Sequence, residues 1–172
     1  MLLPLPPGSL GGPGDYASLI VSADSPQVAI EQFDVQAANR VVFGFGEGWQ
    51  EQEYNPTTGL RWRWMSERGV LRVHAAGRAL ALTIRGEPPA VYFSRPSQVV
   101  VRAGGKVVAA QALWKDFALH VRIPAELVSG DESAVTIETD QMYVPSERSR
   151  RTRDRRHLGL RVFECELAAS RE

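Results

Sequence analysis

The sequence predicts an all-β fold, an antiparallel sandwich or barrel of about nine strands, and three observations support this prediction. Apolar and polar residues alternate with a period of two along much of the chain, as in residues 117–123 and 135–139. Such alternation places one face of a strand on a core and the other in water. These segments are rich in Val, Ile, Phe and Thr, which suit a pleated surface. Gly and Pro turn signals separate them at the short intervals typical of sandwiches and barrels.

The predicted strands follow one another with short connections. Residues 62–74 form either one strand or two strands broken at 66–69. Gly104 and Gly105 predict a tight hairpin, because Gly accepts a positive φ. A single helical turn is expected at 124–127, where Pro124 can take the first position. In chain order the strands are 18–23, 28–35, 40–45, 62–74, 78–85, 98–103 with 106–111, 116–123, 134–139 and 158–167.

The chain has 172 residues, which is enough for one sizeable core and too few for two ordinary domains. We expect a flexible Pro/Gly-rich leader at 1–17, a β-sandwich domain at 18–168 and a short tail at 169–172. No apolar run approaches the roughly 20 residues of a membrane helix, so no membrane span is expected in this chain. The leader has no basic residue before its apolar stretch, which does not fit a signal peptide.

The charge balance and the cysteine count limit the possible partners. Basic and acidic residues both number 20, so the basic excess of a dedicated nucleic-acid binder is absent and no nucleic-acid partner is expected. The one cysteine, Cys165, excludes a disulfide within the chain, and the three histidines are isolated from one another. We therefore expect no metal and no other cofactor. By these features alone the chain is predicted to be cytoplasmic.

No catalytic motif stands out, so the chain is predicted not to be an enzyme. It lacks Gly-x-Ser-x-Gly, a phosphate loop and a dinucleotide fingerprint. A glycosidase pair needs two carboxylates about 5–10 Å apart across a cleft. Glu47, Glu51 and Glu53 fall within one expected loop, so they are not expected to face each other across a cleft. A hydrolase with an unrecognised site is kept as a further hypothesis.

Three of the four Trp residues cluster in two neighbouring stretches, 44–54 and 61–64. Aromatic rings beside Glu, Gln and Arg form the usual surface for sugars. The candidate ligand-binding residues are Trp49, Glu51, Tyr54 and Trp62. The alternative is structural, because Trp is highly buried on average. In that interpretation Trp49 fills one end of the sandwich, and at least one of Trp62 and Trp64 lies in the core.

An arginine-rich segment at 148–156 contains six Arg and one Asp. It is either an anion clamp, for phosphate or lipid head groups, or a long surface loop. In a loop, Asp154 would accept backbone hydrogen bonds and pair with one Arg. We favour the loop for Asp154 and Arg156, which with Gly159 are assigned to locking the last strand. If Asp154 is buried and paired, its removal should cost about 3 kcal/mol or more.

Read in order, several segments resemble one known type of domain. They are Gly48-Trp49, 61–64, 99–107, 117–124, 135–139, 143–145 and Asp154-x-Arg156-x-Leu158-Gly159-Leu160. Over residues 28–167 the chain looks like the jelly-roll, carbohydrate-binding-like domain of bacterial surface-polysaccharide proteins. That domain is often attached to membrane glycosyltransferases and is similar to galactose-binding-like sandwiches. The resemblance implies a two-sheet antiparallel jelly roll, a non-catalytic accessory role linked to glycans, and association with the cell envelope. The arginine-rich loop departs from the pattern.

The sequence therefore predicts a non-catalytic β-sandwich module that binds carbohydrate or assists bacterial cell-surface polysaccharide and glycosyltransfer machinery. The alternative is a protein–protein interaction or oligomerisation domain without sugar binding. Its edge strands or its arginine-rich loop would then bind a partner chain or a second copy.

Overall fold

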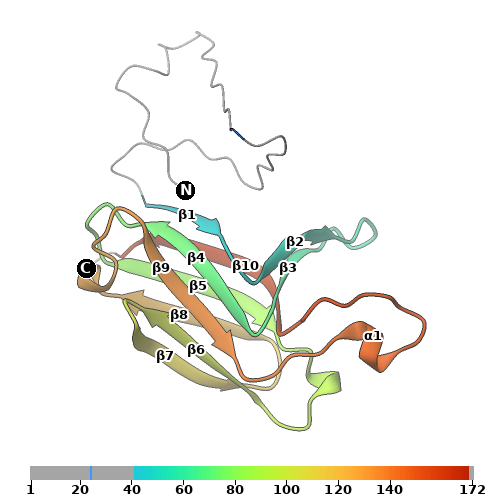
Figure 1. Ribbon diagram of the computed structural model, residues 1–172. Coiled ribbons are helices and arrows are strands. Elements are labelled where there is room, and N and C mark those ends of the chain that lie inside the picture. Colours follow the sequence, from blue (N-terminus) through green and yellow to red (C-terminus); the bar gives the residue numbers. More distant parts are fainter. Residues whose placement is uncertain (1–23, 25–40, 171–172) are drawn as a thin grey trace.

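The computed structural model describes residues 24 and 41–170, and the strands of this part form two antiparallel sheets packed as a sandwich (Figure 1). The predicted all-β, two-sheet fold is confirmed. Sheet A contains, in spatial order, β1 (Val42–Phe45), β4 (Arg68–His74), β9 (Ser133–Thr139), β6 (Ser97–Ala103) and β7 (Lys106–Leu113). Sheet B contains β2 (Trp49–Tyr54), β3 (Arg61–Met65), β10 (Leu160–Ala169), β5 (Leu80–Glu87) and β8 (Phe117–Ile123).

The strands from β3 to β10 have the jelly-roll order. The four strands β3-β10-β5-β8 face the four strands β4-β9-β6-β7, which is the arrangement of two interleaved Greek keys. The predicted segment 62–74 is two strands that belong to different sheets, because the chain crosses between the sheets at Ser66 and Glu67. β1 and β2 each extend one sheet at the same edge of the sandwich.

The core lies between the sheets and is built from the alternating inward side chains of both. Fully buried members include Met65, Leu71, Leu82, Ile84 and Ile137. In β5 and β8, exposed or half-buried residues occupy the positions between the buried ones. The alternation in the sequence therefore predicts the core directly.

The predicted turns also appear in the structure. Gly104 and Gly105 have φ values of 53° and 76° and join β6 to β7, with Ala103 paired to Lys106. This is the two-residue hairpin loop that needs two positive φ angles. The predicted helical turn is a 3₁₀ turn, η2 (Ala125–Leu127), and it begins after Pro124.

One expectation is wrong, because the residues that follow Gly48 form strand β2 and not a loop. β2 pairs with β3 through a turn in which the side chain of Asn55 accepts hydrogen bonds from the N–H groups of Thr57 and Thr58, at 2.9 and 3.2 Å. The sequence of β2 shows no alternation of apolar and polar residues, because four of its six side chains are Glu or Gln. This edge strand projects past the end of the sandwich, where it has little core to cover (Figure 1).

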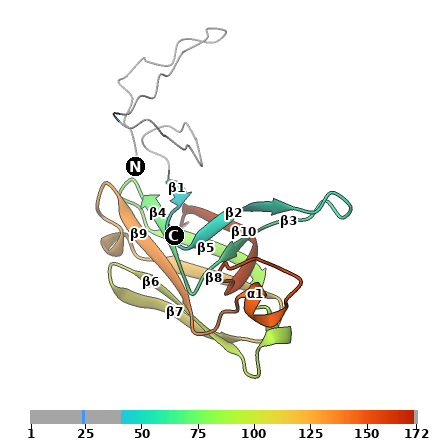
Figure 2. The same ribbon diagram turned by 45° about the vertical axis from the view of Figure 1, so that its right-hand side comes forward.

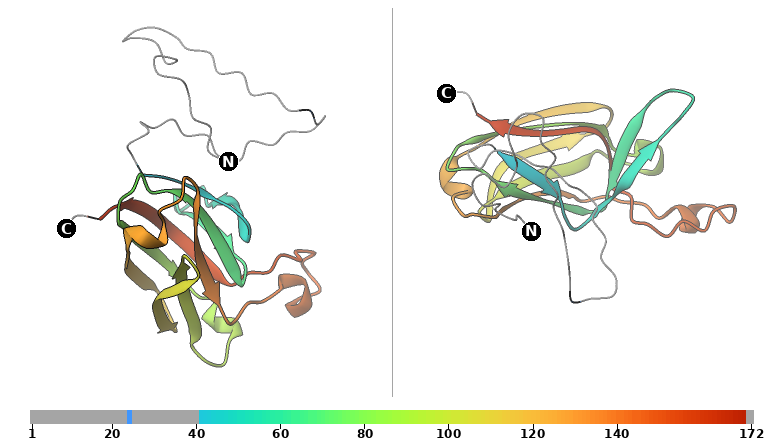
Figure 3. Two further views of the ribbon diagram at one scale, coloured as in Figure 1. Left: turned by 60° about the vertical axis from the view of Figure 1, so that its left-hand side comes forward. Right: turned by 90° about the horizontal axis from the view of Figure 1, so that it is seen from above.

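Two short helices were not predicted, η1 (Ala90–Tyr92) and α1 (Pro145–Arg148). α1 lies in the segment that joins β9 to β10. This segment and the β2–β3 hairpin project from the same end of the sandwich and diverge from each other (Figures 1, 2 and 3). The expected leader and the expected strands 18–23 and 28–35 lie outside the described residues. No helix in the described part of the chain is long and apolar enough to cross a membrane.

Candidate functional site

The outer face of sheet B carries a polar and aromatic cluster where β2, β3 and β10 meet. Met65 of β3 points into the core, so Trp62 and Trp64 point outward. Glu53 lies opposite Trp62 and accepts a hydrogen bond from the indole Nε1 at 3.1 Å. The guanidinium of Arg161 lies 4.2 Å from the centre of the Trp62 ring and pairs with Glu87 at 2.9 Å. Charged groups therefore hold the Trp62 side chain in two ways: Glu53 binds its N–H group and Arg161 lies over its ring.

The loop before β10 is clamped onto this cluster by Arg156. Its guanidinium donates to both carboxylate oxygens of Asp154, at 2.7–3.1 Å, and to Oε1 of Glu53 at 2.7 Å. Asp154 also accepts the backbone N–H of Arg156 at 2.9 Å. The predicted hydrogen bonding of Asp154 is confirmed. The bonds from Arg156 hold the pKa of the Asp154 carboxyl below its usual value, and the same carboxylate raises the pKa of Arg156.

Gly159 lies at a close approach between the loop and the crossover from β3 to β4. Its N–H donates to the carbonyl of Met65 at 2.7 Å. A Cβ at this position would lie 2.6 Å from the carbonyl oxygen of Ser66 and 2.7 Å from Cγ2 of Thr139. Gly159, which the sequence predicts to lock the last strand, is buried at this contact.

An aromatic stack continues from the cluster toward α1. The ring of Tyr143 packs edge-on against Trp64, with 6.2 Å between centroids, and stacks on Tyr92 at 4.2 Å. Two backbone hydrogen bonds, each 3.0 Å long, join Tyr143, which precedes α1, to Leu158, which precedes β10. They hold the start and the end of the β9–β10 connection together. Burial raises the pKa of Tyr143, so the phenol stays neutral and able to donate and accept hydrogen bonds.

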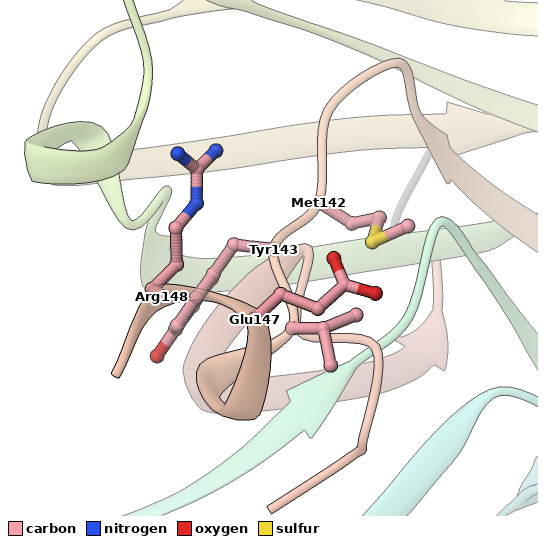
Figure 4. Close-up of a pocket in the computed structure, with 5 residues that line it drawn as sticks. Met142, Tyr143, Glu147 and Arg148 are labelled. Carbon is pink, nitrogen blue, oxygen red and sulfur yellow. The ribbon is translucent and has the colours of Figure 1, made fainter. Parts of the chain in front are cut away.

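A shallow cavity of about 260 Å³ opens beside Tyr143, and we call it the loop cavity. It is lined by Met142, Tyr143, Val144, Glu147 and Arg148. In Figure 4 the carboxylate of Glu147 and the thioether of Met142 lie on one side of it, with Tyr143 and Arg148 on the other. Within the described residues, the side chains of Glu147 and Arg148 have no hydrogen-bond or ion-pair partner, so both are available to a ligand.

In the part of the chain that the structure describes, five arginines of the segment 148–156 are exposed and have no ion-pair partner, in contrast to Arg156. Within residues 41–170 none of the five has a carboxylate oxygen within 4.0 Å. Arg72, Arg95 and Arg102 elsewhere each pair with one. The five unpaired arginines are Arg148, Arg150, Arg151, Arg153 and Arg155.

Trp49 lies at the end of the core. Its indole packs against core side chains and meets the ring of Phe45 edge-on, with centroids 5.0 Å apart. Its Nε1 is buried without a hydrogen-bond partner in the described part of the chain. These contacts support the structural interpretation of Trp49. By contrast, the expectation that Trp62 or Trp64 lies in the core is wrong, because both are half-buried on the outer face of sheet B.

The other predicted contact residues do not form one surface. Tyr54, 54% exposed, pairs across the hairpin with Arg61, whose guanidinium lies 5.3 Å from its ring centre. Trp62 pairs with Glu53, one position away, and so lies on the opposite face of the hairpin. Glu51 is exposed on β2. Sequence reasoning missed Glu53, Tyr92 and Tyr143 as a group, because no local pattern links residues so far apart in the chain.

No three His, Cys, Asp or Glu side chains of the described residues come together as a metal site would require. His120 lies on the outer face of sheet B and hydrogen-bonds to the hydroxyl of Thr83 at 3.2 Å. Comparison with known proteins adds no assignment: no protein-family model matches the sequence, and no curated protein matches it significantly.

Proposed function

We propose that this chain is a non-catalytic, glycan-binding β-sandwich module and that the loop cavity is its binding site. The observation that carries the proposal is the combination of Tyr143, Glu147 and Arg148 around one shallow cavity. Sugars are bound by aromatic rings that pack on C–H groups and by polar groups that take hydroxyls. The cavity offers both.

The site is also held in place before a ligand arrives. Tyr143 is fixed by the stack with Tyr92 and Trp64 and by its backbone bonds to Leu158. A site that is ordered in advance loses less entropy on binding. Glu147 and Arg148 supply an acceptor and several donors. The resemblance to carbohydrate-binding-like jelly rolls of bacterial surface-polysaccharide proteins supports the same role.

The proposal is tested by screening the purified chain on a glycan array and titrating the best-binding glycan by calorimetry. We expect Tyr143→Ala and Glu147→Gln each to weaken binding by about tenfold or more, which corresponds to about 1.4 kcal/mol. Tyr54→Ala is the matched control, because it removes an exposed tyrosine from the β2–β3 hairpin and should leave affinity unchanged.

The outcomes separate the possible sites. Loss of binding in Tyr54→Ala, with Tyr143→Ala unaffected, would move the site to the β2–β3 hairpin with Tyr54 and Glu51. A blank array would reject glycan binding. Circular dichroism of each variant distinguishes a lost contact from a lost fold.

A second candidate function, homo-oligomerisation, is supported by the edge strand β7. Within the described residues β7 pairs with β6 alone, and no residue from Val107 to Leu113 is charged or a proline. Val107 is 51% exposed. An edge strand with a long uncharged stretch and an unpaired backbone edge is a template for pairing with another strand.

Light scattering over a concentration series tests this candidate. Pairing of β7 with a second copy predicts a dimer that dissociates when Val107→Lys and Ala112→Lys place charges on the edge. The control is Ala81→Lys, at an exposed position of the internal strand β5, which should not change the mass. A monomer at all concentrations would exclude this role.

A further inference from the structure

We propose that the ligand of this module is an acidic glycan whose charged groups bind a row of three arginines, Arg151, Arg153 and Arg155. This inference rests on the proposed function and names its ligand class. The row begins three positions after Arg148, which lines the loop cavity. In this proposal a linear glycan places one sugar in the cavity and its acidic groups against the row.

The row arises from alternating exposure of side chains in the segment between α1 and β10. Arg151, Arg153 and Arg155 are exposed, while Thr152, Asp154 and Arg156 between them are half-buried. The three guanidinium groups therefore belong to exposed side chains, and the residues between them pack toward the protein.

The half-buried side of the segment is fastened to the rest of the protein. Thr152 Oγ1 accepts the N–H of Asp154 at 3.1 Å, and the carbonyl of Asp154 accepts the N–H of Ser146 at 2.8 Å. Arg156 ties Asp154 to Glu53 on β2. The backbone that carries the row is therefore held in place, which lowers the entropy cost of binding to a regular ligand.

The chemistry of the segment favours a flexible acidic polymer. The planar guanidinium fork matches carboxylate, sulfate or phosphate groups. Within the described residues the three row arginines have no carboxylate partner, so no carboxylate there neutralises their charges. No residue from 148 to 157 is apolar, so the segment has no side chain to insert into a bilayer. The formal net charge of zero means that the rest of the chain carries an opposing negative charge, which disfavours broad nucleic-acid binding.

The experiment uses the whole chain and two probes that differ only in charge. One is a linear oligosaccharide of uronic acids with a carboxylate on every sugar, and the other is the same oligosaccharide after its carboxyl groups are reduced to alcohols. Affinities are measured by calorimetry at low and moderate salt. The test variant is the triple substitution Arg151→Gln, Arg153→Gln and Arg155→Gln. The control triple, Arg68→Gln, Arg78→Gln and Arg122→Gln, removes the same charge from exposed arginines elsewhere.

We expect the acidic probe to bind more tightly than the neutral one and to lose about tenfold or more in affinity in the row variant. The control triple should change affinity by much less, and added salt should weaken binding of the acidic probe because it screens exposed charges. Equal affinity for both probes, with no effect of the row variant, would overturn the acidic assignment and leave glycan binding intact.

Two further outcomes would also overturn the inference. If neither probe binds and the glycan array is blank, the inference fails together with the proposed function. If anionic lipid vesicles or a single-stranded oligonucleotide bind through the row and the acidic oligosaccharide does not, the row serves a different polyanion.

Discussion

Arg156 and Glu53 are 103 positions apart in the chain, yet Nη1 of the first donates to Oε1 of the second at 2.7 Å. This contact joins the loop before the last strand to the edge strand β2. The same guanidinium holds Asp154, and the same carboxylate holds the indole of Trp62. One cation therefore joins the two projecting segments, the β2–β3 hairpin and the arm that contains α1.

Removing this cation should destabilise the protein. We expect Arg156→Ala to lower the free energy of unfolding by about 2 kcal/mol, because two half-buried carboxylates lose a charged donor. A double-mutant cycle with Glu53→Gln should show a coupling of roughly 1 kcal/mol. Urea unfolding measures both. Arg155→Ala is the control, since this exposed neighbour has no partner in the described residues. Equal losses in the two alanine variants would contradict the clamp.

The stability of the protein should depend on the ionisation of Asp154. Its pKa is lowered in the folded state from an ordinary 3.8, mainly by the hydrogen bond from the side chain of Arg156. A carboxyl whose pKa is lowered by folding stabilises the folded state at any pH above its unfolded-state pKa. This stabilisation is lost as the pH falls through the folded-state pKa. We therefore expect the wild type to lose stability below about pH 4 more steeply than Asp154→Asn. Parallel slopes in urea titrations at several pH values would contradict this linkage.

The magnitude of the Asp154 contribution should be smaller than that of a fully buried pair. The side chains of Asp154 and Arg156 are 26% and 38% exposed, so solvent screens their attraction. We expect Asp154→Ala to cost about 1–2 kcal/mol. This replaces the value of about 3 kcal/mol for a buried, uncompensated partner. A loss below about 0.5 kcal/mol, the level of an ordinary surface change, would remove Asp154 from the loop lock.

Gly159 should not tolerate a side chain. A Cβ there would be only 2.6 Å from the carbonyl oxygen of Ser66, which belongs to the backbone and cannot move aside cheaply. We expect Gly159→Ala to cost about 1–3 kcal/mol through overpacking, as measured by thermal and urea unfolding. Gly105→Ala is not a suitable control because of its positive φ. Gly130→Ala is suitable, since its nearest neighbours are 3.5 Å away, and it should be well tolerated.

Trp49 and Tyr54 offer a direct test of core against surface. Trp49→Ala should cost about 3 kcal/mol, since it removes a large ring from the end of the core. Tyr54→Ala should change stability by less than about 0.5 kcal/mol, because its ring is largely exposed. Chemical denaturation of the two variants checks both values. Similar losses would mean that the hairpin, as well as the core, depends on its aromatic residues.

Cys165 should be unreactive in the folded protein. Burial raises the pKa of its thiol to about 12, so almost no thiolate is present at neutral or mildly alkaline pH. We expect a thiol reagent at about pH 8 to label the native chain slowly and the urea-unfolded chain rapidly. Fast labelling of the native chain would mean that the end of β10 opens readily.

Much of the fold could be predicted because strand alternation is a local property. The hairpin at Gly104 and Gly105, the turn after Pro124 and the strand at 117–123 were all predicted from neighbouring residues. β2 was missed because a projecting edge strand has little apolar surface to bury, so its side chains do not alternate. α1 is too short, at four residues, to leave a helical pattern in the sequence.

The class of fold and the pairing of Asp154 with a nearby arginine could be predicted from the sequence, since each depends on residues close together in the chain. The position of Trp49 in the core, the opposite faces of Trp62 and Tyr54, and the bond from Arg156 to Glu53 could be found only in the folded protein. Strand pairing sets which side of the sheet each residue faces, and a pairing offset by one position reverses it. Which aromatic rings meet solvent therefore depends on contacts between residues that are distant in the sequence.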